Sequence, residues 1–172
     1  MLFREGLRES LRDSEIRELK RMLLLAITVR YEMPRAVEWR RFPRRLYYLP
    51  VCHDVAHAFA QVFGGVAIDG EHMFPMETFQ TEAGAHEGAR FSTLLHSWVE
   101  FETSGGNRFI LDIYPDVNCP VLPVVLRHPN AAYWVPTDEP RVRELATLKG
   151  RKFMKRVQLV ADEMRKVSIS HL

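Results

Sequence analysis

The chain reads LLHSWVEFETSGGNRFILDIY from residue 94 to residue 114. Residues 94–101 and 108–114 are rich in the aromatic and β-branched side chains that favour strands. The segment 103–107 between them, TSGGN, has the composition of a turn. The stretch therefore predicts a β-hairpin, around which the rest of the fold can be built.

The register of this hairpin decides which of its side chains meet, because successive residues of a strand point to opposite faces of the sheet. His96 and Asp112 share a face only if the numbers of paired residues sum to an even value, for instance 96 opposite 112 or 114. A turn of three or five residues gives such a register. A two-residue turn at Gly105 and Gly106 would place Asp112 on the other face. We therefore expect a loose turn if the two side chains act together.

A helix is expected upstream of the hairpin, beginning near Cys52. Pro50 suits the entrance of a helix, Ala56 and Phe59 continue an apolar face, and Gly64 suits the end. Cys52 then lies in the first turn, where unpaired backbone N–H groups and the helix dipole stabilise a thiolate. A thiolate nucleophile needs a base for its proton and a third group that orients the base.

The candidate catalytic residues are Cys52, His96 and Asp112, in that order along the chain. Any one of them alone is better explained as a buried small side chain, an ordinary strand histidine or the cap of a strand end. Their order and placement together indicate a nucleophilic site.

Three motifs lie between residues 51 and 113. They are Val51-Cys52 with Ala56 and Phe59, then His96-Ser97-Trp98-Val99-Glu100, then Phe109-Ile110-Leu111-Asp112-Ile113. This segment resembles the core of the transglutaminase-like cysteine proteins, which belong to the wider papain-like group. The resemblance implies a nucleophilic Cys52 at a helix N-terminus, packed on an antiparallel sheet that presents His96 as the base and Asp112 as the orienting acid.

The resemblance implies a thiol-dependent acyl-transfer enzyme with a peptide or protein substrate, attacked at an amide or thioester. Water as the acceptor makes it a cysteine peptidase or amidase, and an amine makes it a transglutaminase or acyltransferase. The family's usual glycine close before the nucleophile is absent here. Tyr47, Tyr48 and Trp98 are candidates for substrate or oxyanion contacts. Neither a metal ion nor an organic cofactor is required.

Two other functions stay open. Cys52, His53 and His57 lie close in the sequence, and the two histidines, four residues apart, share a helix face, so a zinc hydrolase site is one alternative. The pair lacks the glutamate that follows the first histidine in zinc proteases. The other alternative is a non-catalytic module that binds a partner through its basic flanks.

The expected fold class is α+β, with the helix that bears Cys52 packed on an antiparallel sheet. The length of 172 residues fits one domain, with a papain-like core at about residues 46–135. Helical flanks at 1–45 and 136–172 should cover this core.

The flanks contain two further patterns of apolar residues at helical spacing. One helix should begin at Asp13 or Ser14, with Pro34 at or just after its end. The other should run to about Lys166, with Gly150 as a point of interruption.

Two polar or proline-rich stretches remain. Residues 69–90 are acidic and contain three glycines, which predicts a long loop that covers a cleft. Residues 115–140 hold six of the 10 prolines, which favours extended segments and edge strands over helix.

Charge is segregated along the chain, although the net charge is only +2. Residues 1–50 hold 12 basic and 7 acidic side chains, residues 51–140 hold 3 and 12, and residues 141–172 hold 9 and 3. The basic flanks either bind a nucleic acid or an anionic surface, or pack around the acidic middle. The second arrangement is the commoner one, so a nucleic-acid partner is not expected.

Composition indicates an ordinary globular protein, with 47% apolar and 27% charged residues. Its longest apolar run, residues 22–29, is far shorter than the roughly 20 residues of a membrane-spanning helix. Residues 1–10 lack a secretory signal, so a cytoplasmic location with free Cys52 and Cys119 thiols is expected. The sequence does not indicate an oligomeric state.

Overall fold

The structure is a computed structural model that describes residues 11–36, 52–75, 91–114, 122–148 and 152–169. In chain order its elements are α1 (Asp13–Ala36), α2 (Cys52–Phe63), β1 (Val66–Pro75), β2 (Phe91–Glu102), β3 (Arg108–Asp112), β4 (Val124–Arg127), β5 (Tyr133–Trp134), α3 (Glu139–Leu148) and α4 (Phe153–Ile169). This content places the described chain in the α+β class, as the sequence predicts.

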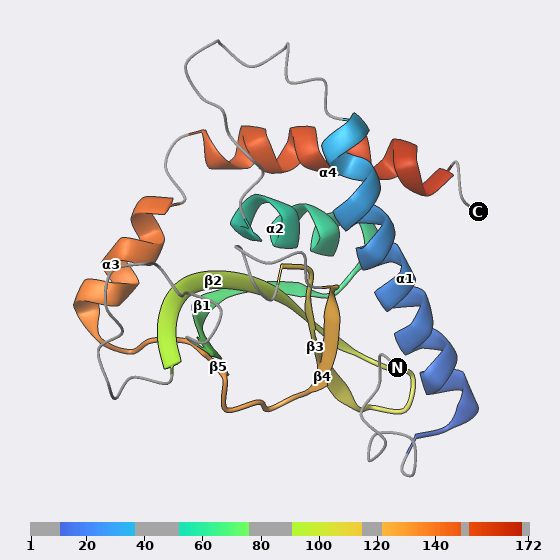
Figure 1. Cartoon of the computed structure of the whole chain (residues 1–172), viewed down its shortest axis with the longest axis horizontal. Coiled ribbons are helices and arrows are strands. Elements are labelled where there is room, and N and C mark those ends of the chain that lie inside the picture. Colours follow the sequence, from blue (N-terminus) through green and yellow to red (C-terminus); the bar gives the residue numbers. More distant parts are fainter. Residues whose placement is uncertain (1–10, 37–51, 76–90, 115–121, 149–151, 170–172) are drawn as a thin grey trace, which may run out of the picture.

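The strands form one five-stranded sheet with the order β4-β3-β2-β1-β5. Every neighbouring pair is antiparallel. The sheet is strongly curved, and the long strands β1 and β2 lie across its middle (Figure 1). The two short strands from the proline-rich region, β4 and β5, occupy the two edges, which confirms the expectation of edge strands there.

The hairpin of β2 and β3 has the loose turn that the sequence argument requires. Glu102 pairs with Arg108, which leaves residues 103–107 as a five-residue turn. The paired residue numbers therefore sum to an even value, and His96 and Asp112 share one face of the sheet. The register thus brings these two side chains to the same side.

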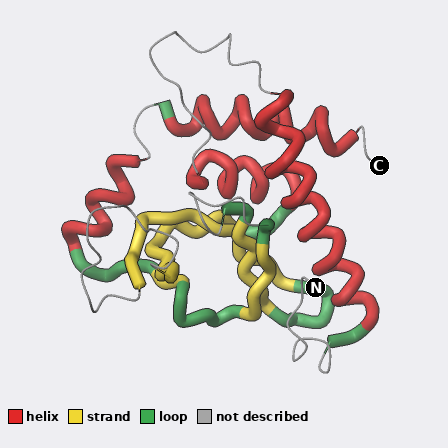
Figure 2. Tube along the Cα trace, viewed as in Figure 1, coloured by secondary structure: helices red, strands yellow, loops and turns green. Residues whose placement is uncertain are grey.

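Helices α2 and α4 lie together on one side of the sheet, while α1 runs down past one end of it and α3 stands apart at the other (Figure 2). The amphipathic α2 packs on β1 and β2, α4 packs on α2, and α1 contacts both α4 and β4. Helix α4 therefore covers α2, and α1 packs beside them against α4 and β4. The large core between sheet and helices includes Phe59 of α2, Val99 of β2 and Met164 of α4, each fully enclosed.

The opposite face of the sheet carries a second, smaller core. Trp98, Ile110 and Tyr133 are buried there, and the rings of Trp98 and Tyr133 meet edge to face at 5.3 Å between centroids. His96 and Asp112 alternate onto this face. These two residues therefore lie beside a packed aromatic cluster on the same face of the sheet.

Two predicted boundaries are wrong. Residues 69–75 belong to β1 and not to a loop, because pairing with β2 and β5 satisfies their backbone despite the acidic side chains. Gly70 allows close approach instead of a turn, since a Cβ atom there would lie 2.5 Å from Cη2 of Trp98. Helix α1 also continues two residues beyond Pro34, to Ala36. The remainder of the predicted loop, residues 76–90, lies outside the described residues.

The C-terminal flank is partly neutralised by the acidic middle of the chain. Arg156 of α4 pairs with Asp54 of α2 at 2.9 Å, and Arg141 of α3 pairs with Glu71 of β1 at 3.0 Å. The arginine-rich stretch 37–51 lies outside the described residues. Within the described helices, none is both long and apolar enough to cross a membrane.

Candidate active site

Cys52 is the first residue of α2, as the sequence predicts. The side chain lies where the helix N-terminus meets the sheet, and the residue is only 7% exposed. Backbone N–H groups of a first helical turn have no partner within the helix, so this position favours an anion. The local structure is therefore suited to a thiolate.

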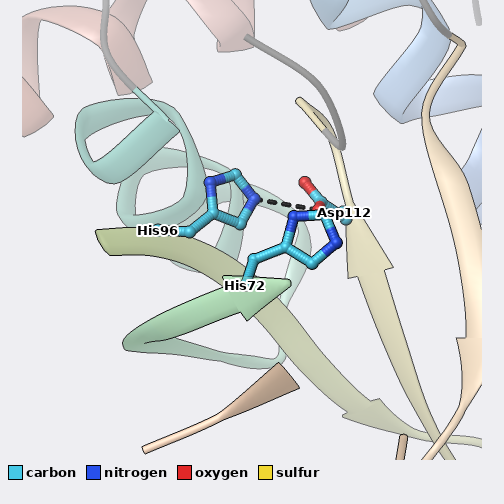
Figure 3. Close-up of side chains that lie close together, drawn as sticks. All are labelled: His72, His96 and Asp112. Atoms are coloured by element: carbon cyan, nitrogen blue, oxygen red, sulfur yellow. Dashed lines mark hydrogen bonds and ion pairs between the residues drawn. The ribbon is translucent and has the colours of Figure 1, made fainter. Parts of the chain in front are cut away.

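His96 of β2 lowers the pKa of the Cys52 thiol through its hydrogen bonding and its charge, so the two side chains lie within interaction distance. On its other side the imidazole of His96 is held by Asp112, with 2.8 Å between Nε2 and Oδ2. This bond is the dashed line in Figure 3, which shows the His96 ring pointing at the carboxylate at the end of β3. The fold therefore brings Cys52, His96 and Asp112 together in the predicted order of contact.

Asp112 is completely buried and is held by two further donors. The backbone N–H of Tyr114 donates to Oδ1 at 2.9 Å, and the hydroxyl of Tyr133 donates to Oδ2 at 2.8 Å. Burial alone would raise the pKa of Asp112, but the charge and the hydrogen bond of His96 and the hydrogen bond of Tyr133 lower it instead. The carboxylate therefore stays ionised and fixed in orientation.

The thiol and the imidazole have pKa values displaced in opposite directions. Burial would raise the pKa of Cys52, yet hydrogen bonds and charge from neighbouring histidines lower it to about 6. Burial would lower the pKa of His96, yet Asp112 and Cys52 raise it to about 10. At neutral pH the pair is therefore a thiolate and an imidazolium, the form in which a cysteine is a nucleophile.

A second histidine, His72 of β1, completes a compact group with His96 and Asp112 (Figure 3). Its ring stacks on Tyr133 at 4.3 Å between centroids and lies 5.4 Å from the ring of His96. One ligand atom from each of the three residues lies within 4.8 Å of the others, so this group could hold a divalent metal ion. A bound metal would have to displace the proton that His96 shares with Asp112.

The metal set expected as an alternative, Cys52 with His53 and His57, does not form among the described residues, where His72, His96 and Asp112 are the only such group. Both helix histidines turn toward Asp69 of β1 instead. Nε2 of His57 lies 3.0 Å and Nδ1 of His53 lies 3.6 Å from Oδ1 of Asp69.

Of the residues predicted to contact the substrate or the oxyanion, the structure describes only Trp98. Trp98 is 2% exposed and belongs to the second core, so it offers a substrate little surface. Its indole N–H donates to Glu100, which also pairs with Arg108. Tyr47, Tyr48 and Cys119 lie outside the described residues.

The sequence did not predict the structural role of three residues near the site. Tyr133 reaches Asp112 from an edge strand 21 residues away in the chain. Ser97 and Asp69 face each other across β1 and β2 and together hold His53. Because β1 was predicted to be a loop, no sequence signal placed Asp69 opposite Ser97.

No family model, curated protein or solved structure matches the chain. The fold and the site therefore carry the functional argument by themselves. They define an α+β protein in which a buried helix-terminal cysteine contacts a histidine that is oriented by a buried aspartate.

Proposed function

We propose that the protein is a cysteine-nucleophile acyl-transfer enzyme of the transglutaminase-like type, with a papain-like core. The observation that carries the proposal is the 2.8 Å hydrogen bond of His96 with the buried Asp112, together with the position of Cys52 at the N-terminus of α2, where His96 lowers the pKa of its thiol. Structural cysteines in apolar cores are protonated and inert, whereas this one sits beside cationic donors. The arrangement supports nucleophilic catalysis.

Each residue of the proposed triad has a distinct task. The Cys52 thiolate attacks the carbonyl carbon of an amide or thioester and forms a thioester with the acyl group. The His96 imidazolium gives its proton to the leaving amine or thiolate, and the neutral imidazole then takes a proton from the acceptor. Asp112 keeps the ring in position and stabilises its charged form.

Tyr133 is a positioning residue in this scheme, because it touches Asp112 and not the reacting atoms. Burial and the adjacent carboxylate raise the pKa of its hydroxyl, so the hydroxyl remains a donor. Its second contact, the stacked ring of His72, helps to fix the orientation of both. The acceptor decides between hydrolysis and transfer, and a peptide or protein amide is the proposed substrate class.

The proposal is tested by incubating the protein with p-nitrophenyl acetate and locating the acetyl group by peptide mass spectrometry. The expected result is acetylation of Cys52, which Cys52→Ala abolishes and His96→Ala strongly slows. His128→Ala is the matched control, because that histidine pairs with Glu100 instead. Equal acetylation in wild type and His96→Ala would contradict the assignment of the base.

A further inference from the structure

A second imidazole, that of His53, also lowers the pKa of the Cys52 thiol through its hydrogen bonding and its charge. It stands on the residue directly after the nucleophile and is 7% exposed. Nδ1 of His53 lies 2.5 Å from Oγ of Ser97 on β2. The nucleophile is therefore flanked by two histidines, each anchored to a different part of the sheet.

The hydrogen-bond directions fix where His53 carries its proton. The Ser97 hydroxyl donates its one proton to Oδ1 of Asp69, so it can only accept from Nδ1–H of His53. Asp69 is itself held by His57, whose Nε2 lies 3.0 and 3.1 Å from the two carboxylate oxygens. The network thus commits Nδ1–H to Ser97, so the N–H that is left for a substrate is Nε2–H of the protonated ring.

His53 is also cationic at neutral pH. Burial would lower its pKa, but the hydrogen bonds and charges of Asp69 and Cys52 raise it to about 9. The thiol releases only one proton, and the pair of His96 and Asp112 is sufficient to take it. A second imidazolium is therefore not needed to form the thiolate. The position of His53 next to Cys52 suggests a different role.

Negative charge moves during the attack on a carbonyl. The Cys52 sulfur forms a bond to the carbonyl carbon while the π electron pair of the C=O bond moves onto oxygen. When that pair returns, the C=O bond re-forms and the bond to the leaving group breaks. The oxygen that holds the charge in between is two bonds away from the sulfur, within reach of a donor that already contacts the sulfur.

We propose that His53, positioned by Ser97 and Asp69, is the side-chain donor that stabilises this oxyanion. The inference rests on the proposed function of Cys52 as a nucleophile. The donor stands on the residue next to the nucleophile, at the same N-terminus of α2. An electrostatic donor of this kind must act in the transition state and cannot be replaced by a group without an N–H.

Two probes of the same thiol separate this role from simple activation of Cys52. Iodoacetamide alkylates by displacement at a saturated carbon and forms no oxyanion, whereas p-nitrophenyl acetate acylates through one. The ratio of the acylation rate to the alkylation rate at Cys52 therefore reports oxyanion stabilisation independently of the thiolate fraction. The ratio is measured in wild type, His53→Ala, His53→Gln and Ser97→Ala, with His128→Ala as the control.

The ratio should fall about 100-fold in His53→Ala, because one oxyanion donor is worth about that much. It should fall about 10-fold or less in His53→Gln, which keeps an N–H donor without the charge, and by an intermediate factor in Ser97→Ala. Circular dichroism checks that each variant is folded.

Two results would overturn the inference. If the ratio in His53→Ala stays within about threefold of wild type, His53 only tunes the thiol and stabilises no oxyanion. If the ratio falls as far in His53→Gln as in His53→Ala, the essential role of His53 is proton transfer and not hydrogen-bond donation to the oxyanion. Absence of acylation at Cys52 in the wild type would instead overturn the proposed function, and this inference with it.

Discussion

The thiolate form of Cys52 links folding stability to pH, and this link can be measured without a substrate. The thiol loses its proton at about pH 6 in the native state and near its ordinary pKa of 9.0 in the unfolded chain. Between these two values the native state binds one proton fewer at this residue than the unfolded state. A lowered native pKa contributes stability that is fully present above pH 9 and is lost as the pH falls through 6.

The size of the effect follows from the width of this window. One proton of difference changes the free energy of unfolding by about 1.4 kcal/mol per pH unit. Over the three units of the window the contribution of Cys52 amounts to about 4 kcal/mol. Between pH 6 and pH 9, where each titration is half complete, the stability of wild type relative to Cys52→Ala should therefore rise by about 3 kcal/mol, whatever constant offset the substitution adds.

The measurement is urea unfolding of wild type and Cys52→Ala at four pH values from 6 to 9, under reducing conditions. His53 and His96, whose native pKa values are raised, contribute stability that is lost as the pH rises above 6.5. Because Cys52 is one cause of these raised pKa values, their effect is smaller in Cys52→Ala, and the part that remains in the difference opposes the gain from the thiol. A difference that stays constant with pH would refute the argument, because it would mean that the native thiol is protonated.

Asp112→Asn should reduce acylation of Cys52 by p-nitrophenyl acetate by about 10²- to 10⁴-fold, since the imidazole loses the charge that orients it. A surface aspartate of α4 changed to asparagine is the control, and an unaffected rate in Asp112→Asn would contradict the role of the acid. Wild-type acylation should rise with pH near 6, where the thiolate forms, and a turnover assay should fall near 10, where His96 loses its proton. A single inflection near pH 9 would exclude a thiolate–imidazolium pair of Cys52 and His96. Gly70→Ala should lower the urea midpoint by the equivalent of about 1–3 kcal/mol, because its Cβ would lie 2.3 Å from the backbone oxygen of Trp134. An unchanged midpoint would show that β1 and β5 can move apart. Dialysis against EDTA should leave acylation unchanged, and a loss that zinc restores would favour a metal site.

The sequence predicted those parts of the site that depend on local pattern. The position of Cys52 follows from Pro50 before it and the apolar face after it. The shared face of His96 and Asp112 follows from the alternation of the two strands and a turn of odd length, which the pairing of β2 and β3 confirms. Both conclusions use residues that are near neighbours in the chain or in one hairpin.

The parts that the sequence did not predict depend on contacts between distant segments. The strand β1 has acidic residues and a glycine where a strand is expected to be apolar, because Asp69 is used to hold two histidines. Gly70 reads as a turn residue, but its lack of a side chain makes room for Trp98. Tyr133 lies in a two-residue strand, which is too short to show any alternation.

The connection of α1 to the hairpin is another feature without a local signal. Glu15 in the first turn of α1 is buried and accepts hydrogen bonds from Thr103 at 2.6 Å and from Asn107 at 2.7 Å. These bonds lower the pKa of Glu15 to about 2. In the sequence the residue looks like an ordinary acidic residue of a first helical turn, yet it fixes the N-terminal flank to the turn of β2 and β3.

The most direct test of the central claim is the alkylation of Cys52 by iodoacetamide as a function of pH, read by peptide mass spectrometry, in wild type and in His96→Ala. Cys119 in the same samples serves as the reference thiol. The account predicts an inflection near pH 6 for Cys52 in wild type, because the neighbouring histidines hold the thiolate, and a clear upward shift of that inflection in His96→Ala. If Cys52 follows the same pH dependence as Cys119, or keeps its inflection without His96, the claim of an activated nucleophile is contradicted.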